Sequence, residues 1–165
     1  MTHANIDDAL DLVVKHFRGV KDEDGEAYVM HCLRVMHGTS SPDAQLVGLM
    51  HDLIEDTPVT LDDLRDIGFS AAVIEGVNLV THRDGDSYAE YVIKLKPNAI
   101  ARDAKMSDLR DNASMNRVLY RETSTQSDAK RIQRYVLSYQ FLGDRIDEST
   151  YRRLMADLQD ESPQS

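Results

Sequence analysis

Apolar residues give way to histidine and acidic residues within residues 46–57, which are Leu-Val-Gly-Leu-Met-His-Asp-Leu-Ile-Glu-Asp-Thr. This change indicates both the fold class and the position of a functional site. The stretch opens with an apolar run, which predicts a buried helix. Histidine and acidic residues follow directly, and these are His51, Asp52, Glu55 and Asp56. Carboxylates near the C-terminal end of a helix oppose its dipole. A local rule broken in this way is often the mark of a functional site, where a bound metal ion would supply the missing positive charge.

The spacing of these four residues limits what they can bind together. His51 and Asp52 are adjacent, so in a continuous helix their side chains point about 100° apart. They could therefore serve one ion only if it lay beside the helix, between the two directions. Glu55 lies one turn after His51, and Asp56 lies one turn after Asp52. Neighbouring faces of the helix thus present candidate metal ligands and further acidic side chains.

Two further residues, His31 and Asp108, have the chemistry to complete a metal site from other helices. Two imidazoles and two carboxylates suit a divalent ion of intermediate hardness, with water at the remaining positions. The chain has one cysteine, which excludes an internal disulfide and argues against a structural zinc site. Each of these residues is common by itself. Together they predict a metal centre formed by His31, His51, Asp52 and Asp108.

Polar residues also recur at helical spacing around Asp108. Lys105, Asp108 and Asn112 are three and four residues apart, so they share a helix face. That face offers a cation, a metal ligand and an amide, which suits a phosphate and a ribose or base edge. On the helix of His31, Arg34 lies one turn further on and could pair with an acidic residue of the site, such as Glu55 or Asp56.

Apolar residues repeat at helical spacing along nearly the whole chain, and strand signals are nearly absent. Helices are expected over residues 6–17, 27–36, 42–57, 60–68, 70–80, 87–95, 98–112, 127–142 and 147–158. Ser41 before Pro42 is a typical helix start, as is Thr60 before its acidic neighbours. The predicted fold class is therefore all-α, in one domain over residues 1–160 with a frayed tail over 161–165.

The composition narrows the class of ligand. The formal net charge is −10 over 165 residues, of which 41% are hydrophobic, an ordinary balance for one globular domain. So acidic a chain has no broad surface for nucleic acid, and anionic membranes would repel it. One small anion can still bind where a metal ion or local cations outweigh the overall negative charge of the protein. With no recognisable signal peptide or membrane span, a cytosolic protein is expected, and a homo-oligomer stays open.

Three strings together carry a resemblance to a known family. They are Gly-Glu-Ala-Tyr-Val-Met-His at residues 25–31, His-Asp-Leu-Ile-Glu-Asp-Thr at 51–57, and Lys-Met-Ser-Asp-Leu-Arg-Asp-Asn at 105–112. These strings resemble those of the HD-superfamily hydrolase domain of RelA/SpoT proteins and of their stand-alone small alarmone hydrolase relatives. The similarity runs from Lys21 to Asn112, and its most specific part is the string at 51–57.

The resemblance implies a single helical HD-domain bundle that binds Mn²⁺. The implied ligands are His31, His51, Asp52 and Asp108. Glu55 and Asp56 would be the catalytic carboxylates. Lys105 and Asn112 would help to bind a small anionic nucleotide. The implied reaction removes pyrophosphate from the 3′ position of (p)ppGpp and leaves GDP or GTP.

The chain departs from the family at the residues that recognise the base. The family usually has an Arg-Lys pair before the first string, where this chain has Val20-Lys21. Lys21 can stand for the family's lysine, but Val20 cannot stack on guanine as a guanidinium does. Arg18 is a nearby arginine that could take its place. Ala27 replaces a proline of the family's loop.

Three functions therefore stay open at this point. The first is an Mn²⁺-dependent (p)ppGpp pyrophosphohydrolase, which the string at 51–57 favours. The second is an HD enzyme for another nucleotide, such as a nucleoside 5′-monophosphatase, for which Val20 leaves room. The third is a non-catalytic nucleotide sensor, which is disfavoured because all the metal ligands and both acidic residues are present.

Overall fold

The computed structural model describes residues 4–115 and 125–160 and confirms the all-α fold class. The helices are α1 Ile6–His16, α2 Tyr28–His37, α3 Pro42–Met50, α4 Leu53–Asp56, α5 Leu61–Ile67, α6 Ala71–Val80, α7 Tyr88–Leu95, α8 Ala99–Asn112, α10 Thr125–Leu142 and α11 Glu148–Asp160. Across these described ranges, no helix is both long and apolar enough to cross a membrane. The frayed tail expected over 161–165 lies outside the described residues.

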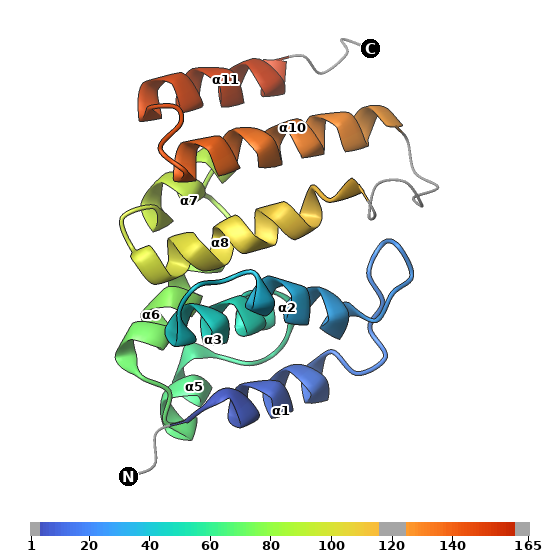
Figure 1. Ribbon diagram of the computed structural model, residues 1–165, viewed down its shortest axis with the longest axis vertical. Coiled ribbons are helices and arrows are strands. Elements are labelled where there is room, and N and C mark those ends of the chain that lie inside the picture. The colour runs from blue at the N-terminus through green and yellow to red at the C-terminus, as the bar shows by residue number, and fades with distance from the viewer. Residues whose placement is uncertain (1–3, 116–124, 161–165) are drawn as a thin grey trace.

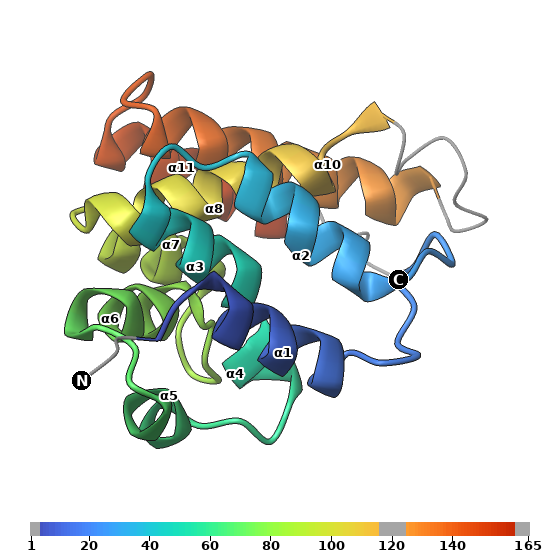
Figure 2. The ribbon, with the colours of Figure 1, turned by 60° about the horizontal axis from the view of Figure 1, so that its bottom comes forward.

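The helices stack along the long axis of the molecule, from α1 at one end to α11 at the other (Figure 1). Helix α3 packs against α1, α2, α6 and α8, and α8 packs in turn against α10, which contacts α11. Helix α5 lies far from α11 in both views (Figures 1 and 2). The middle of the stack is therefore formed by α3 and α8, the two helices that position His51, Asp52 and Asp108.

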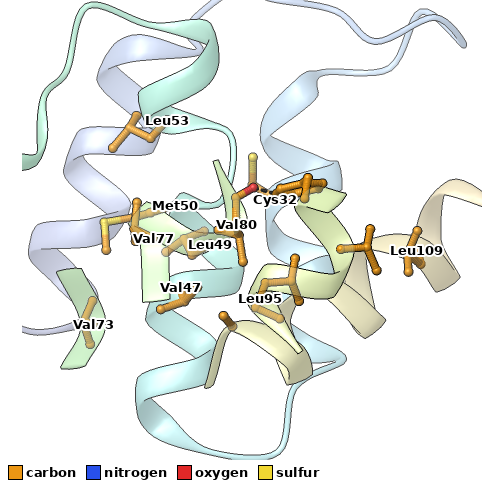
Figure 3. Close-up of a cluster of buried hydrophobic side chains, with 14 of the residues drawn as sticks. Cys32, Val47, Leu49, Met50, Leu53, Val73, Val77, Val80, Leu95 and Leu109 are labelled. Atoms are coloured by element: carbon orange, nitrogen blue, oxygen red, sulfur yellow. Dashed lines mark hydrogen bonds between the residues drawn. The ribbon is translucent and has the colours of Figure 1, made fainter. Parts of the chain in front are cut away.

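The core forms around α3 because this helix is apolar on nearly every side. Its buried residues are Ala44, Val47, Gly48, Leu49 and Met50. Figure 3 shows Leu49 beside Val77 and Val80 of α6 in the buried cluster. Gly76 of α6 permits this close packing, since a Cβ there would lie 2.7 Å from Val47 Cγ2. The chain thus reaches His51 from within the core.

The helix predicted over residues 42–57 is interrupted in its middle. Helix α3 ends at Met50 and α4 begins at Leu53. Between them Asp52 has φ −99° and ψ 0°, in the sparsely populated bridge region where many active-site residues lie. The expectation of one continuous helix over residues 42–57 is therefore wrong. Because the backbone turns here, both side chains can approach one point.

The predicted helix starts agree with the structure. The Ser41 hydroxyl accepts a hydrogen bond from the Ala44 N–H at 3.3 Å, with Pro42 at the first turn. Thr60 forms a capping box with Asp63. Such side chains satisfy N–H groups that have no partner within the helix, which is why the sequence locates helix starts well.

The α1–α2 loop, residues 17–27, is held in place by its own contacts. An isolated antiparallel bridge pairs Lys21 with Ala27. Two ion pairs, each 2.7 Å long, tie the loop to α2 and α10, and they are Arg34–Glu26 and Arg131–Glu23. The loop therefore has a defined position beside the centre of the helix stack.

Candidate metal centre

Side chains from three parts of the chain meet at one buried point. They are His31 from α2, His51 and Asp52 from the turn after α3, and Asp108 from α8. His31, His51 and Asp108 are 2%, 3% and 4% exposed, and one ligand atom of each lies within 4.8 Å of the others. Asp52 Oδ2 lies 2.8 Å from His51 Nε2 and 3.9 Å from His31 Nε2. The four residues predicted as ligands are therefore brought together.

Hydrogen bonds determine which nitrogen of each imidazole faces this point. His51 Nδ1 donates to the carbonyl oxygen of Gly48 at 2.8 Å, and His31 Nδ1 donates to Asp111 Oδ2 at 2.7 Å. The two Nε2 atoms are left facing each other at 3.1 Å. Metal-bound histidines characteristically donate their other ring N–H to a carbonyl or a carboxylate. The residues present thus fit a divalent ion, and this buried group could bind one.

The carboxylates make this point favourable for a positive charge. Burial opposes protonation of His51, but Asp52 and Asp108 hold its pKa well above the usual range. Lys105 Nζ lies 2.8 Å from Asp108 Oδ2. Despite burial, this ammonium and the two imidazoles hold the pKa of Asp108 well below its usual range. Asp108 is therefore ionised and available as a ligand.

Tyr28, at the start of α2, contacts the ligand on the turn after α3. Its hydroxyl donates to Asp52 Oδ2. Burial and the neighbouring Asp52 carboxylate raise the pKa of Tyr28 far above its usual value, so the phenol stays protonated as a donor. Tyr28 thus holds the Asp52 carboxylate in place.

Asp111 on α8 is a site residue to which sequence reasoning gave no role. Besides accepting from His31, its Oδ1 lies 2.6 Å from Arg34 Nε. Burial raises the pKa of Asp111, but the hydrogen bonds from His31 and Arg34 outweigh it and hold the pKa at about 2. Arg34 thus pairs with an acidic residue of the site, as expected, but that residue is Asp111 rather than Glu55 or Asp56.

A cavity of about 350 Å³, here called the main cavity, opens beside the ligands. Its walls are formed by Tyr28, His31, Asp52, Glu55, Val80, His82, Tyr88, Tyr91, Lys105, Asp108, Asn112, Arg134 and Tyr135. Lys105 and Asn112 thus share a face with Asp108 as predicted, and Asn112 Nδ2 donates to Asp108 Oδ1 at 2.5 Å. Glu55 Oε2 accepts from the backbone N–H of His82 at 3.0 Å, which fixes this carboxylate in the wall.

A side cavity of about 280 Å³ adjoins the main cavity, because Tyr28, Asn112 and Tyr135 line both. Val20 and Lys21 of the α1–α2 loop line it as well. Lys21 therefore lies next to the region of the candidate metal ligands. The aliphatic side chain of Val20 lines the same side cavity.

Two of the predicted site residues lie elsewhere. Arg18 is exposed and lines neither cavity. Asp56 is also exposed and lines neither, although it follows Glu55 directly. Burial, together with the charges of Asp52 and Glu55, raises the pKa of Asp56. The catalytic role of Asp56 and the binding role of Arg18 stay predictions.

The wall of the main cavity also includes residues that sequence reasoning left out. His82 follows α6, and its ring centroid lies 5.0 Å from that of Tyr91 on α7. Arg134 of α10 lies over the ring of Tyr88, with 4.6 Å between the guanidinium carbon and the ring centroid. No spacing in the sequence links these residues to the ligands, because the packing of α6 and α10 against α8 brings them there.

No protein-family model matches the sequence, and a search of curated proteins finds no match. Among solved structures, the chain is similar to a metazoan ortholog of SpoT, described as hydrolysing ppGpp and playing a role in starvation responses. The match has a TM-score of 0.66 and covers 98% of each chain at 18% sequence identity. The likeness establishes that the chain shares the fold of that ppGpp-hydrolysing protein.

Proposed function

We propose that this protein is a divalent-metal-dependent phosphohydrolase that removes the 3′-pyrophosphate of (p)ppGpp. The observation that carries the proposal is the meeting of His31, His51, Asp52 and Asp108 at one buried point beside a cavity. The fold it shares with a ppGpp-hydrolysing protein supports the same activity. We propose Mn²⁺ as the ion, on the resemblance of the sequence strings.

The four ligands would hold the ion, and a bound divalent ion lowers the pKa of water and polarises phosphoryl oxygens. In this proposal Glu55 accepts the proton of the attacking water, because its carboxylate lines the main cavity and is held by His82. Lys105 offsets charge that develops on the phosphoryl group. Asn112 and Lys21 contact the nucleotide where the two cavities meet. Asp56 would assist Glu55 in proton transfer.

The test is to incubate metal-loaded protein with ppGpp and to measure GDP and pyrophosphate. Asp52→Asn should reduce turnover by more than about 100-fold, since even loss of an outer partner of a metal ligand costs 10- to 100-fold. Asp62→Asn is the matched control, because Asp62 is exposed on α5 and pairs with Arg65 alone among the described residues. Absence of turnover in folded, metal-loaded protein would refute the alarmone as substrate.

A second candidate is an HD-type hydrolase of another nucleotide, such as a nucleoside 5′-monophosphatase. Val20 favours it, because an aliphatic side chain lines the side cavity where the resembling family has an arginine that stacks on guanine. Product analysis separates the two candidates. Release of 5′-phosphate from a nucleoside monophosphate supports this one, and release of pyrophosphate from the 3′ position supports the first.

A further inference from the structure

Arg134 on α10 occupies an unusual place in the main cavity. Its guanidinium carbon lies 4.6 Å from the ring centroid of Tyr88 and 5.6 Å from that of Tyr135. All three residues line the cavity that the metal ligands border. A guanidinium stacked on aromatic rings keeps its fork of N–H donors in a fixed orientation.

Arg134 has no acidic partner among the described residues. Other arginines of this acidic chain do, as in the pairs Arg34–Asp111, Arg102–Asp144, Arg131–Glu23 and Arg152–Glu90. Arg134 Nε is buried and has no hydrogen-bond partner within residues 4–115 and 129–158. An arginine kept in a cavity without a carboxylate is a cation that lacks a counter-charge.

A second polar atom without a partner lies at the same place. The Tyr88 hydroxyl is buried and makes no hydrogen bond to any residue in the described part of the chain. A buried donor left unpaired loses its hydrogen bond to water without replacement, so native structures rarely keep one without a reason. Two such donors on stacked neighbours would both be satisfied by an anion with several acceptor oxygens.

The charges of the main cavity show what kind of anion this would be. Lys105, the other cation of the wall, pairs with Asp108 at 2.8 Å and is assigned in the proposed function to the group being cleaved. Asp52 and Glu55 add negative charge, which repels a polyanion. Arg134 stacks on the aromatic residues of α7 and α10, and within the described residues no hydrogen bond or ion pair joins it to the four candidate ligands. It is therefore suited to a phosphate that is distinct from the group being cleaved.

We propose that Arg134, with Tyr88, binds a second phosphate group of the nucleotide and so selects substrates that carry two separate phosphoryl groups. The proposal rests on the proposed function, in which the first group is cleaved at the metal centre. The planar fork of arginine binds phosphate with two parallel hydrogen bonds, and the stacked ring of Tyr88 supports it.

The test compares kcat/KM for ppGpp and for guanosine 3′-diphosphate, which lacks the 5′ phosphates. The wild type should prefer ppGpp by about 10- to 100-fold, the range that one or two charge-assisted hydrogen bonds supply. Arg134→Gln should remove this preference by raising KM for ppGpp while kcat changes little. Arg153→Gln, the same change on exposed α11, should keep the wild-type preference.

Tyr88→Phe keeps the aromatic ring under Arg134 and removes only the hydroxyl without a partner. It should leave thermal stability unchanged or raise it, and should lower the preference for ppGpp by about 3- to 10-fold. If Arg134→Gln lowers kcat/KM for both nucleotides equally, or for neither, the selective role of Arg134 is refuted.

Failure of the proposed function gives a different pattern. If the wild type cleaves neither nucleotide, the alarmone reaction is refuted while the binding site is still tested by calorimetric titration of GDP and guanosine. Arg134→Gln should then weaken GDP binding by at least about 10-fold and leave guanosine binding unchanged. Equal affinity of the two proteins for GDP would overturn the inference.

Discussion

Asp111 contributes to the candidate metal centre through its contact with His31. It accepts the Nδ1–H of His31 and is held in turn by Arg34, so the ring is fixed with Nε2 toward the other ligands. Partners of this kind orient metal ligands and increase their basicity. The carboxylate therefore controls both the tautomer and the direction of one ligand.

Asp111→Asn should lower metal affinity and turnover by about 10- to 100-fold, because an amide can present its NH₂ group to His31 and select the wrong tautomer. Metal affinity is measured by competition with a chelator, and turnover by the ppGpp assay. The matched control is Asp103→Asn on the same helix, since Asp103 accepts from Ser40 away from the site. An unchanged affinity in Asp111→Asn would show that the contact is only structural.

Spacing in the sequence could have indicated this residue, because Asp111 lies three positions after Asp108 on one helix face. The same reasoning placed Lys105 and Asn112 correctly beside Asp108. It could not place Arg134 or His82. Their positions depend on how α10 and α6 pack against α8, which the periodicity of a single helix does not contain.

At the scale of helices, the turn at His51-Asp52 is the main departure from expectation. Apolar periodicity continues through Leu53, so the pattern predicts one helix where the structure has two. The interruption depends on the backbone of Asp52, whose conformation fits its contacts to Tyr28 and His51. Local propensity is overridden here because tertiary contacts at the metal centre fix the turn.

The contact of α6 with α3 depends on Gly76, and Gly76→Ala should destabilise the protein by about 1–3 kcal/mol. The added Cβ would lie 2.7 Å from Val47 Cγ2 and 3.2 Å from Ile100 Cγ2, so helices or side chains must shift. Denaturant unfolding measures the loss. In a Val47→Ala background the same substitution should cost less, and an equal cost in both backgrounds would contradict the packing argument.

The turn between α10 and α11 is joined to α7 and α8 by Asp144. Its carboxylate lies 2.9 Å from Lys96 Nζ and 2.5 Å from Arg102 Nη2. The hydrogen bonds from Lys96 and Arg102 lower the pKa of Asp144. Because the folded-state pKa is below the unfolded one, this carboxylate stabilises the fold above about pH 4, and the contribution is lost as the pH falls through the folded-state pKa.

Asp144→Asn should therefore lower the unfolding temperature at neutral pH, and the difference from wild type should shrink as the pH falls through the lowered folded-state pKa of Asp144. Asparagine is the appropriate replacement because Asp144 has a positive φ of 57°, a conformation that asparagine tolerates. Asp84→Asn in the exposed turn before α7 should have no effect at neutral or acidic pH. A difference that persists in acid would argue against the ion pairs as its cause.

At the scale of the whole molecule, the metal centre joins α2, α3 and α8, so an ion bound there should stabilise the folded chain. At about 100 times its dissociation constant, Mn²⁺ should add about 2.7 kcal/mol, or roughly 5–10 °C in the unfolding temperature. Differential scanning fluorimetry of chelator-treated protein, with and without Mn²⁺, measures the shift. Asp52→Asn should abolish it and Asp62→Asn should keep it, whereas an equal shift in both would place the ion elsewhere.

The fold class followed from the sequence because helical periodicity and caps depend on near neighbours in the chain. The residues that meet at the candidate metal centre followed from several weak patterns considered together, and their role as ligands stays a prediction. Oligomerisation and the domain bounds at residues 1–160 stay predictions, because apolar helix faces do not distinguish internal packing from contact with a second copy. The substrate likewise depends on details of the wall, such as Val20, that no periodic pattern fixes.

The α1–α2 loop has a consequence for how such a protein can evolve. The ligands lie on or beside α2, α3 and α8, whereas the side cavity takes part of its wall from Val20 and Lys21 of this loop. The loop is tied to α2 and α10 by surface ion pairs and contributes no metal ligand. If the proposed function holds, substitutions in this loop would alter which base is accepted and leave the hydrolytic chemistry unchanged, so related chains could diverge in substrate while keeping the same metal centre.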